Sequence, residues 1–116
     1  MSESIIQKKT FAFGLEIIQL YCKLREQREY VLSKQLLRSG TSIGANVVEA
    51  LAGQSRNDFL SKMAIASKEA RETKYWLQLL QASQLADLNF TRELAQVDEI
   101  IHMLTSIVKT TSEKRK

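Results

Sequence analysis

The chain has 116 residues, 44% of them hydrophobic, which is enough apolar material for one domain with its own core. This content excludes a wholly disordered chain, and no apolar run approaches the roughly 20 residues that a membrane-spanning helix needs. The 17 Lys and Arg residues exceed the 13 Asp and Glu residues, so the net charge is +4 and the pI is near 9.3. This balance favours anionic partners such as nucleic acid, but only modestly.

Apolar residues recur at helical spacing in four segments, at about residues 4–26, 29–54, 58–84 and 90–110. The absence of proline allows helix almost everywhere. The predicted core stripes are Phe11, Leu15, Ile18 and Cys22 in the first segment, Leu32, Leu36, Ser39, Ile43, Val47 and Ala50 in the second, Phe59, Met63, Ala66, Ala70, Thr73, Leu77 and Leu80 in the third, and Leu94, Val97, Ile101, Leu104 and Val108 in the fourth. Short links between long helices make neighbours antiparallel. The sequence therefore predicts one all-α domain over residues 1–116, an up-down-up-down four-helix bundle whose residues 111–116 fray.

Three of these segments carry a second apolar stripe. In the segment 29–54 it lies about 140° from the first stripe. The surplus residues of the middle two segments are Leu37, Gly44, Val48 and Leu51, then Ile65, Trp76 and Leu79. The first segment adds Ile6, Ile17, Leu20 and Leu24. A wide core is one interpretation. We favour self-association through the surplus residues of the middle two segments, because contiguous exposed apolar patches mark interfaces.

The run from Ser39 to Asn46 is a poor helix, since each of its two glycines costs up to ~1 kcal/mol relative to alanine. It indicates close approach of a neighbouring helix, and a loop is the alternative. Asn46 falls beside the core stripe, where an unpaired amide costs about 1–3 kcal/mol. We predict a buried polar network and keep a ligand site as the alternative. The network residues are Ser42, Asn46, Glu49, Glu69 and Glu72.

No pattern of catalytic residues is complete. Glu99 and His102 match the Glu-x-x-His element of di-iron bundles, but His102 is the one histidine and a second element cannot exist in the same chain. Nothing in the sequence indicates that a histidine activates Cys22, and no glycine-rich phosphate loop occurs. We expect no enzyme activity, no metal and no cofactor. The single cysteine and the lack of a secretory signal pattern at residues 1–9 favour a cytoplasmic protein.

Basic residues follow two of the predicted helices. Lys68, Arg71 and Lys74 form a diagonal strip, and Lys34 and Arg38 lie one turn apart. For any one of them a solvated surface is the simpler interpretation. As a set they are typical of a surface that contacts phosphates without reading bases, whose affinity falls steeply with salt.

Several short motifs resemble the bacterial 23S rRNA intervening-sequence proteins, also called the four-helix bundle protein family. They are Ser42-Ile43-Gly44-Ala45-Asn46 with Glu49-Ala50, then Asp58-Phe59, Lys68-Glu69-Ala70, Glu72-Thr73 and Tyr75-Trp76-Leu77. The resemblance is specific from about residue 30 to 80. In the first and last predicted helices it is limited to the general pattern of residues. It carries over no catalytic residues.

The resemblance implies a homo-oligomer, a pentamer in members of that family, and association with nucleic acid. Genes of this family can lie inside inserts in large-subunit rRNA genes. A related branch comprises accessory proteins of diversity-generating retroelements, which bind a reverse transcriptase. We therefore expect a homopentamer that binds RNA or DNA through its basic residues. The rival hypothesis is an adaptor that docks a partner enzyme such as a reverse transcriptase.

Overall fold

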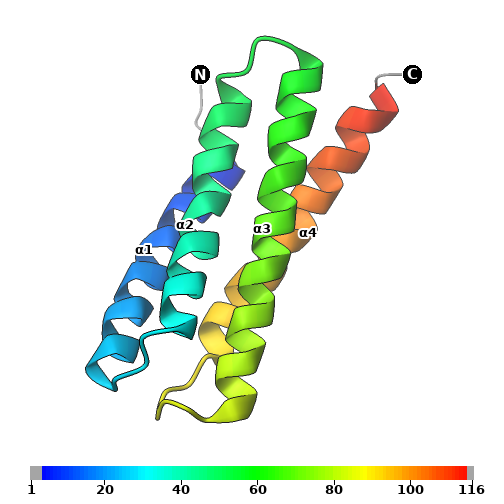
Figure 1. Cartoon of the computed structure of the whole chain (residues 1–116). Coiled ribbons are helices and arrows are strands. Elements are labelled where there is room, and N and C mark those ends of the chain that lie inside the picture. Colours follow the sequence, from blue (N-terminus) through cyan, green and yellow to red (C-terminus); the bar gives the residue numbers. More distant parts are fainter. Residues whose placement is uncertain (1–3, 115–116) are drawn as a thin grey trace.

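Four α-helices account for most of residues 4–114, the part of the chain that the computed structural model describes (Figure 1). They are α1 (Ile5–Glu26), α2 (Leu32–Leu51), α3 (Arg56–Ser83) and α4 (Thr91–Lys114). Each helix runs antiparallel to the next one in the chain and packs against it, and α1 and α4 close the square. The predicted all-α up-down-up-down bundle is confirmed.

The start of α2 is fixed by a side chain that precedes it. The Glu29 carboxylate accepts hydrogen bonds from the backbone N–H groups of Val31, Leu32 and Ser33, at 3.2, 3.0 and 2.6 Å. These are the donors that the first turn of a helix leaves without internal partners. The helix therefore begins at Leu32, three residues after the predicted start, and Glu29 lies outside it as a cap.

The end of α4 also differs from the prediction. The helix continues to Lys114, so the expectation that residues 111–114 fray is wrong, and residues 115 and 116 lie outside the described part. Ile107 and Val108 are half-buried against the core. This anchor stabilises the turns around it, and the last turn can propagate from there.

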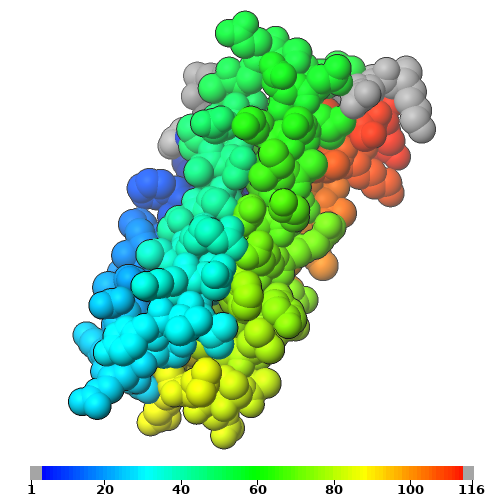
Figure 2. Space-filling view, viewed as in Figure 1, coloured from blue at the N-terminus to red at the C-terminus, as the bar shows by residue number. Residues whose placement is uncertain are grey.

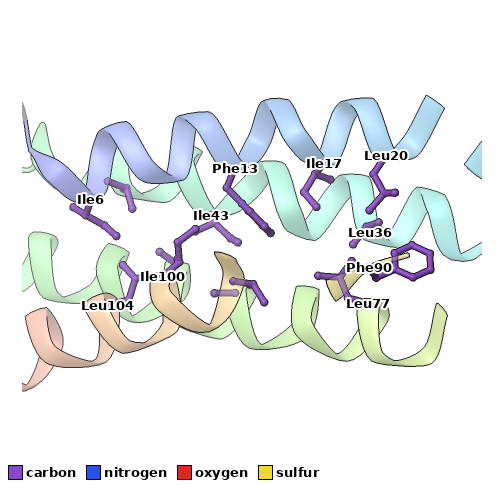
Figure 3. Close-up of a cluster of buried hydrophobic side chains, with 14 of the residues drawn as sticks. Ile6, Phe13, Ile17, Leu20, Leu36, Ile43, Leu77, Phe90, Ile100 and Leu104 are labelled. Atoms are coloured by element: carbon purple, nitrogen blue, oxygen red, sulfur yellow. The ribbon is translucent and has the colours of Figure 1, made fainter. Parts of the chain in front are cut away.

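The core lies where the four helices face one another (Figure 3). The predicted stripes of α2 and α3 are buried except for Leu32 and Phe59, which are half-buried, and Leu36, Ile43 and Leu77 are fully inaccessible to solvent. α4 contributes Val97, Ile100 and Leu104, and Phe90 precedes it in the link from α3. The predicted stripe of α4 is correct in part, because Leu94, Ile101 and Val108 are only half-buried while Ile100 takes a core position.

The predicted core stripe of α1 is wrong. Phe11, Leu15 and Ile18 are 69%, 49% and 43% exposed, and Cys22 is exposed as well. The opposite stripe, about 150° round the helix, is buried instead. It consists of Ile6, Thr10, Phe13, Ile17, Leu20 and Leu24. This stripe buries more large apolar surface, and the Thr10 hydroxyl is satisfied because it donates to the Ile6 carbonyl at 2.8 Å.

The glycine-containing run 39–46 lies inside α2, which excludes the loop alternative. Gly40 is buried, and a Cβ atom added to it would lie 2.8 Å from Cγ2 of Ile17. Glycine is therefore needed here to let α1 and α2 approach closely, as the sequence predicted.

Candidate nucleic-acid interface

The five predicted phosphate contacts lie on the outer sides of α2 and α3. These helices turn their apolar stripes to the core, so residues on the opposite arc of each face solvent. Lys34, Arg38, Lys68 and Arg71 are exposed, and Lys74 is half-exposed. The helices α2 and α3 form the front of the molecule in Figure 2, with α1 at the left and α4 at the right.

Arg38 is held by acidic residues of the neighbouring helix. Its guanidinium contacts the Glu69 carboxylate at 3.4 Å and forms a second ion pair with Glu72. The Trp76 indole N–H also donates to Glu72, at 3.0 Å. The positive charge of Arg38 is therefore largely compensated, and this group links α2 to α3.

Lys74 is compensated in the same way. Its Nζ atom lies 2.7 Å from Oδ1 of Asp98 on α4. Lys34 and Lys68 form no ion pair with any residue from 4 to 114, and Arg71 donates only to the neutral Thr105 hydroxyl, at 3.5 Å. Of the five predicted phosphate contacts, two are therefore compensated by acidic residues. The other three have a positive charge that no acidic residue of the described part compensates. Lys34 is on α2, whereas Lys68 and Arg71 are on α3, so the set does not form one compact patch.

A groove of about 390 Å³ runs between α3 and α4 beside Arg71. Its lining includes Ser67, Thr105 and a further cation, Lys109. Sequence reasoning missed Lys109. Because α3 and α4 are antiparallel and Arg71 meets Thr105, a residue four later on α4 lies level with one four earlier on α3. Lys109 is thereby placed opposite Ser67, a relation that helix periodicity does not reveal until the register of the two helices is known.

The predicted oligomer interface falls on two different sides of the bundle. Gly44 and Val48 of α2 line a groove of about 640 Å³ together with α1. The α1 residues in this groove include Phe11, Leu15 and Ile18, which the sequence had assigned to the core. Leu37 and Leu51 share the same stripe of α2, and Leu51 is 43% exposed.

The α3 part of the predicted interface is separate from that groove. Ile65, Trp76 and Leu79 are half-buried, and the bond from Trp76 to Glu72 places this indole beside the ion pair to α2. The exposed apolar surface of α1 and α2 is therefore a more continuous candidate for assembly. We define the α1/α2 face as Phe11, Gly14, Leu15, Ile18, Thr41, Gly44, Ala45 and Val48.

The predicted buried polar network is not formed. Ser42, Asn46, Glu69 and Glu72 are only half-buried, and Glu49 is exposed and pairs with Lys62 at 3.5 Å. The Asn46 amide donates to the backbone carbonyl of Ser42 at 2.8 Å, so it is satisfied within its own helix.

The buried polar contact between helices lies elsewhere. The hydroxyl of Thr73 donates to the hydroxyl of Ser39 at 2.8 Å, and both residues are fully buried. They are the two hydroxyl residues in the predicted core stripes of α2 and α3. A search for polar residues at facing core positions could have found this pair.

The model of the 23S rRNA-intervening sequence protein family matches residues 2–106. The chain belongs to this family. A crystal structure of a protein with unknown function from the S23 ribosomal protein family of Bacteroides thetaiotaomicron VPI-5482 is 46% identical, with a TM-score of 0.86. That alignment covers 90% of this chain and 96% of the other. Among curated proteins, no match was found.

The region shared with the 23S rRNA-intervening sequence proteins includes all five predicted phosphate contacts, whereas Lys109 lies beyond residue 106. Within residues 4–114 no group of three or more His, Cys, Asp and Glu side chains is placed to hold a metal. His102 is exposed, and Glu99 forms an ion pair with Lys9 at 3.1 Å. None of the described helices is long and apolar enough to cross a membrane.

Proposed function

We propose that this chain is a non-enzymatic RNA-binding protein that works as a homo-oligomer, with rRNA as its first candidate ligand. The observation that carries the proposal is a set of exposed cations without acidic partners on a member of a 23S rRNA-intervening sequence protein family. These cations are Lys34, Lys68 and Arg71, while Arg38 and Lys74 add positive potential that Glu72 and Asp98 reduce. Contacts of this kind bind the phosphate backbone and carry little sequence information.

Assembly increases the affinity that such a modest charge can provide. One copy has a net charge of +4, and several copies in a ring present that charge to the same polyanion. The α1/α2 face supports assembly, since Phe11 is 69% exposed and Leu15, Ile18 and Val48 are between 43% and 51% exposed beside it. The family resemblance supports a pentamer.

Binding is tested by titrating labelled rRNA fragments and duplex DNA with the protein over a series of salt concentrations. We expect the logarithm of the binding constant to fall linearly with the logarithm of the salt concentration, by about 0.7–0.9 for each phosphate contact. Lack of binding to RNA and DNA alike at low salt would rule out the proposed function.

Assembly is tested by light scattering on Leu15→Asp. Leu15 lies in the α1/α2 face, and its charge-bearing variant should leave the helix content unchanged and convert the oligomer to monomers. Leu85→Asp is the matched control, because Leu85 is 59% exposed in the link between α3 and α4 and lies outside this face. A wild-type monomer at micromolar concentration, or an equal effect of both variants, argues against assembly through this face.

The same exposed apolar groove supports a second candidate function, an adaptor that docks a partner enzyme such as a reverse transcriptase. A groove of about 640 Å³ lined mostly by apolar side chains is suited to an amphipathic helix. The two functions differ in what survives purification. A specific enzyme partner that stays bound after nuclease treatment and high salt, and that Leu15→Asp releases, favours the adaptor.

A further inference from the structure

We propose that the groove between α3 and α4 seats a phosphate group of the RNA backbone. Ser67 donates its hydroxyl hydrogen to a phosphate oxygen, and Arg71 and Lys109 supply the positive charge. The inference rests on the proposed function and deepens it, because it assigns the phosphate contact to one groove and adds Ser67 and Lys109 to the contact residues.

Ser67 is the unusual feature of this groove. It is only 6% exposed and lines the groove, yet its hydroxyl has no hydrogen-bond partner among residues 4–114. The other buried hydroxyl groups of that range, those of Thr10, Ser33, Ser39 and Thr73, all donate to a carbonyl or to each other. The Ser67 oxygen is not among the sealed atoms that lack a partner, so it reaches the groove, where a ligand or a water molecule can complete its hydrogen bond.

The charge around Ser67 is suited to an anion. Arg71 and Lys109 flank the groove on α3 and α4, and neither forms an ion pair within the described residues. Arg71 donates to Thr105 through one Nη atom, which leaves the other N–H groups of its fork for an acceptor. Lys68 lies one turn from Arg71 on α3 and is exposed, so the positive potential extends past the rim.

Glu113 is the acidic residue among the groove's lining residues. It opposes anion binding, so the two cations exceed it by one charge within the groove itself. Removal of Glu113 should therefore change the affinity in the direction opposite to removal of Arg71 or Lys109. If a phosphate binds here, removal of the Glu113 charge must strengthen binding.

A phosphodiester fits this combination better than the carboxylates of an acidic peptide. The groove offers guanidinium, ammonium and hydroxyl donors on both sides, from Ser67 and Arg71 on α3 and from Thr105, Lys109 and Ser112 on α4. Phosphate accepts hydrogen bonds on several oxygens at once, and protein contacts to nucleic-acid phosphates come from these same side-chain types. The groove also lies open between two helices, which a continuous polymer requires.

The test uses the full-length protein and an rRNA fragment that the wild type binds, with the variants Ser67→Ala and Lys109→Ala. We expect Ser67→Ala to weaken binding about tenfold, since it removes one hydrogen bond to a charged group. Because serine is uncharged, Ser67→Ala should leave the salt dependence of the binding constant unchanged. Its thermal stability should equal or exceed that of the wild type, because no internal hydrogen bond is lost. Lys109→Ala should weaken binding and lower the salt slope by about one.

Matched controls separate the groove from general effects. Ser106→Ala removes an exposed hydroxyl on α4, and Lys23→Ala removes one positive charge from α1. Both should bind as the wild type does, apart from a small loss of long-range attraction in Lys23→Ala. Glu113→Gln should bind more tightly than the wild type.

The possible failures are distinguishable. If the wild type binds no nucleic acid, the proposed function fails and this inference fails with it. If the wild type binds RNA but Ser67→Ala and Lys109→Ala match their controls, the groove is excluded as the phosphate seat and the proposed function stands. Equal displacement of RNA by poly-glutamate, with the same sensitivity to Ser67→Ala, would show that the groove takes carboxylates and would also overturn the inference.

Discussion

The contact between α1 and α2 at Gly40 can be tested with a single methyl group. A Cβ atom at Gly40 would lie 2.8 and 2.9 Å from the two γ carbons of Ile17 and 3.2 Å from its Cβ. Ile17 is completely buried and β-branched, so it has one strongly preferred rotamer in a helix and little room to move. In Gly40→Ala, therefore, the helices must separate slightly or Ile17 must leave its rotamer.

The magnitude follows from two opposing contributions. Alanine stabilises a helix interior by about 0.8–1.0 kcal/mol relative to glycine. Overpacking of a well-packed core costs about 1–3 kcal/mol. The net effect of Gly40→Ala is then a loss of about 1 kcal/mol. Gly14 in α1 is the matched control, because an added Cβ there meets no atom within 4 Å. Gly14→Ala should gain up to ~1 kcal/mol.

Urea unfolding, followed by far-UV circular dichroism at several protein concentrations, measures both variants and separates folding from association. A Gly40→Ala variant as stable as Gly14→Ala would refute the reasoning, since the close contact would then impose no cost. The double variant Gly40→Ala with Ile17→Ala removes both γ carbons. It should lose less stability than the two single variants together, by more than ~0.5 kcal/mol.

Three further substitutions test other polar groups by the same unfolding assay. Glu29→Ala should lose about 1–2 kcal/mol, because three N–H groups at the start of α2 lose their acceptor; no loss would show that the cap is dispensable. Thr73→Val should lower the free energy of unfolding by about 1–3 kcal/mol, because the buried Ser39 hydroxyl then keeps only one long hydrogen bond of 3.5 Å to a carbonyl. The double variant with Ser39→Ala should restore part of this loss. Glu93→Met should gain about 1 kcal/mol, because Glu93 is 9% exposed and one carboxylate oxygen has no partner; a loss would mean that its charge near the start of α4 matters more.

Helix number, order and most of the core could be predicted from periodicity alone. In α2 and α3 one stripe is clearly the more apolar, so the direction of the core is unambiguous. α1 carries two apolar stripes of similar quality. Periodicity alone does not say whether Phe11 or Phe13 faces the core, because that depends on which stripe fits against α2 and α4. The buried stripe is the one whose Ile17 packs closely against Gly40 of α2.

The candidate site was harder to predict than the fold. The sequence identified Arg38 and Lys74 as exposed cations, but their partners Glu72 and Asp98 lie on other helices. Whether a cation is compensated depends on the register of neighbouring helices, which a one-helix wheel leaves undetermined. Lys109 could not be predicted as a contact residue for the same reason. Its position in the groove follows only from the register that places it opposite Ser67 of α3.

The arrangement of the helices makes assembly and RNA binding compatible. In the closed square, α1 and α2 form one side and α3 and α4 form the opposite side. In a ring the α1/α2 face of one copy meets a different patch of the next, and a ring whose second patch lies outside α3 and α4 leaves the α3/α4 groove uncovered. In a ring these grooves would repeat on every copy, and a backbone that binds one groove meets the next at a high effective concentration.

A monomeric Leu15→Asp variant should thus bind a short RNA that spans one groove as well as the wild type does. It should bind a long RNA at least 100-fold more weakly, at the lower end of the usual avidity gain. Equal loss for both lengths would mean that Leu15 itself belongs to the RNA-binding surface.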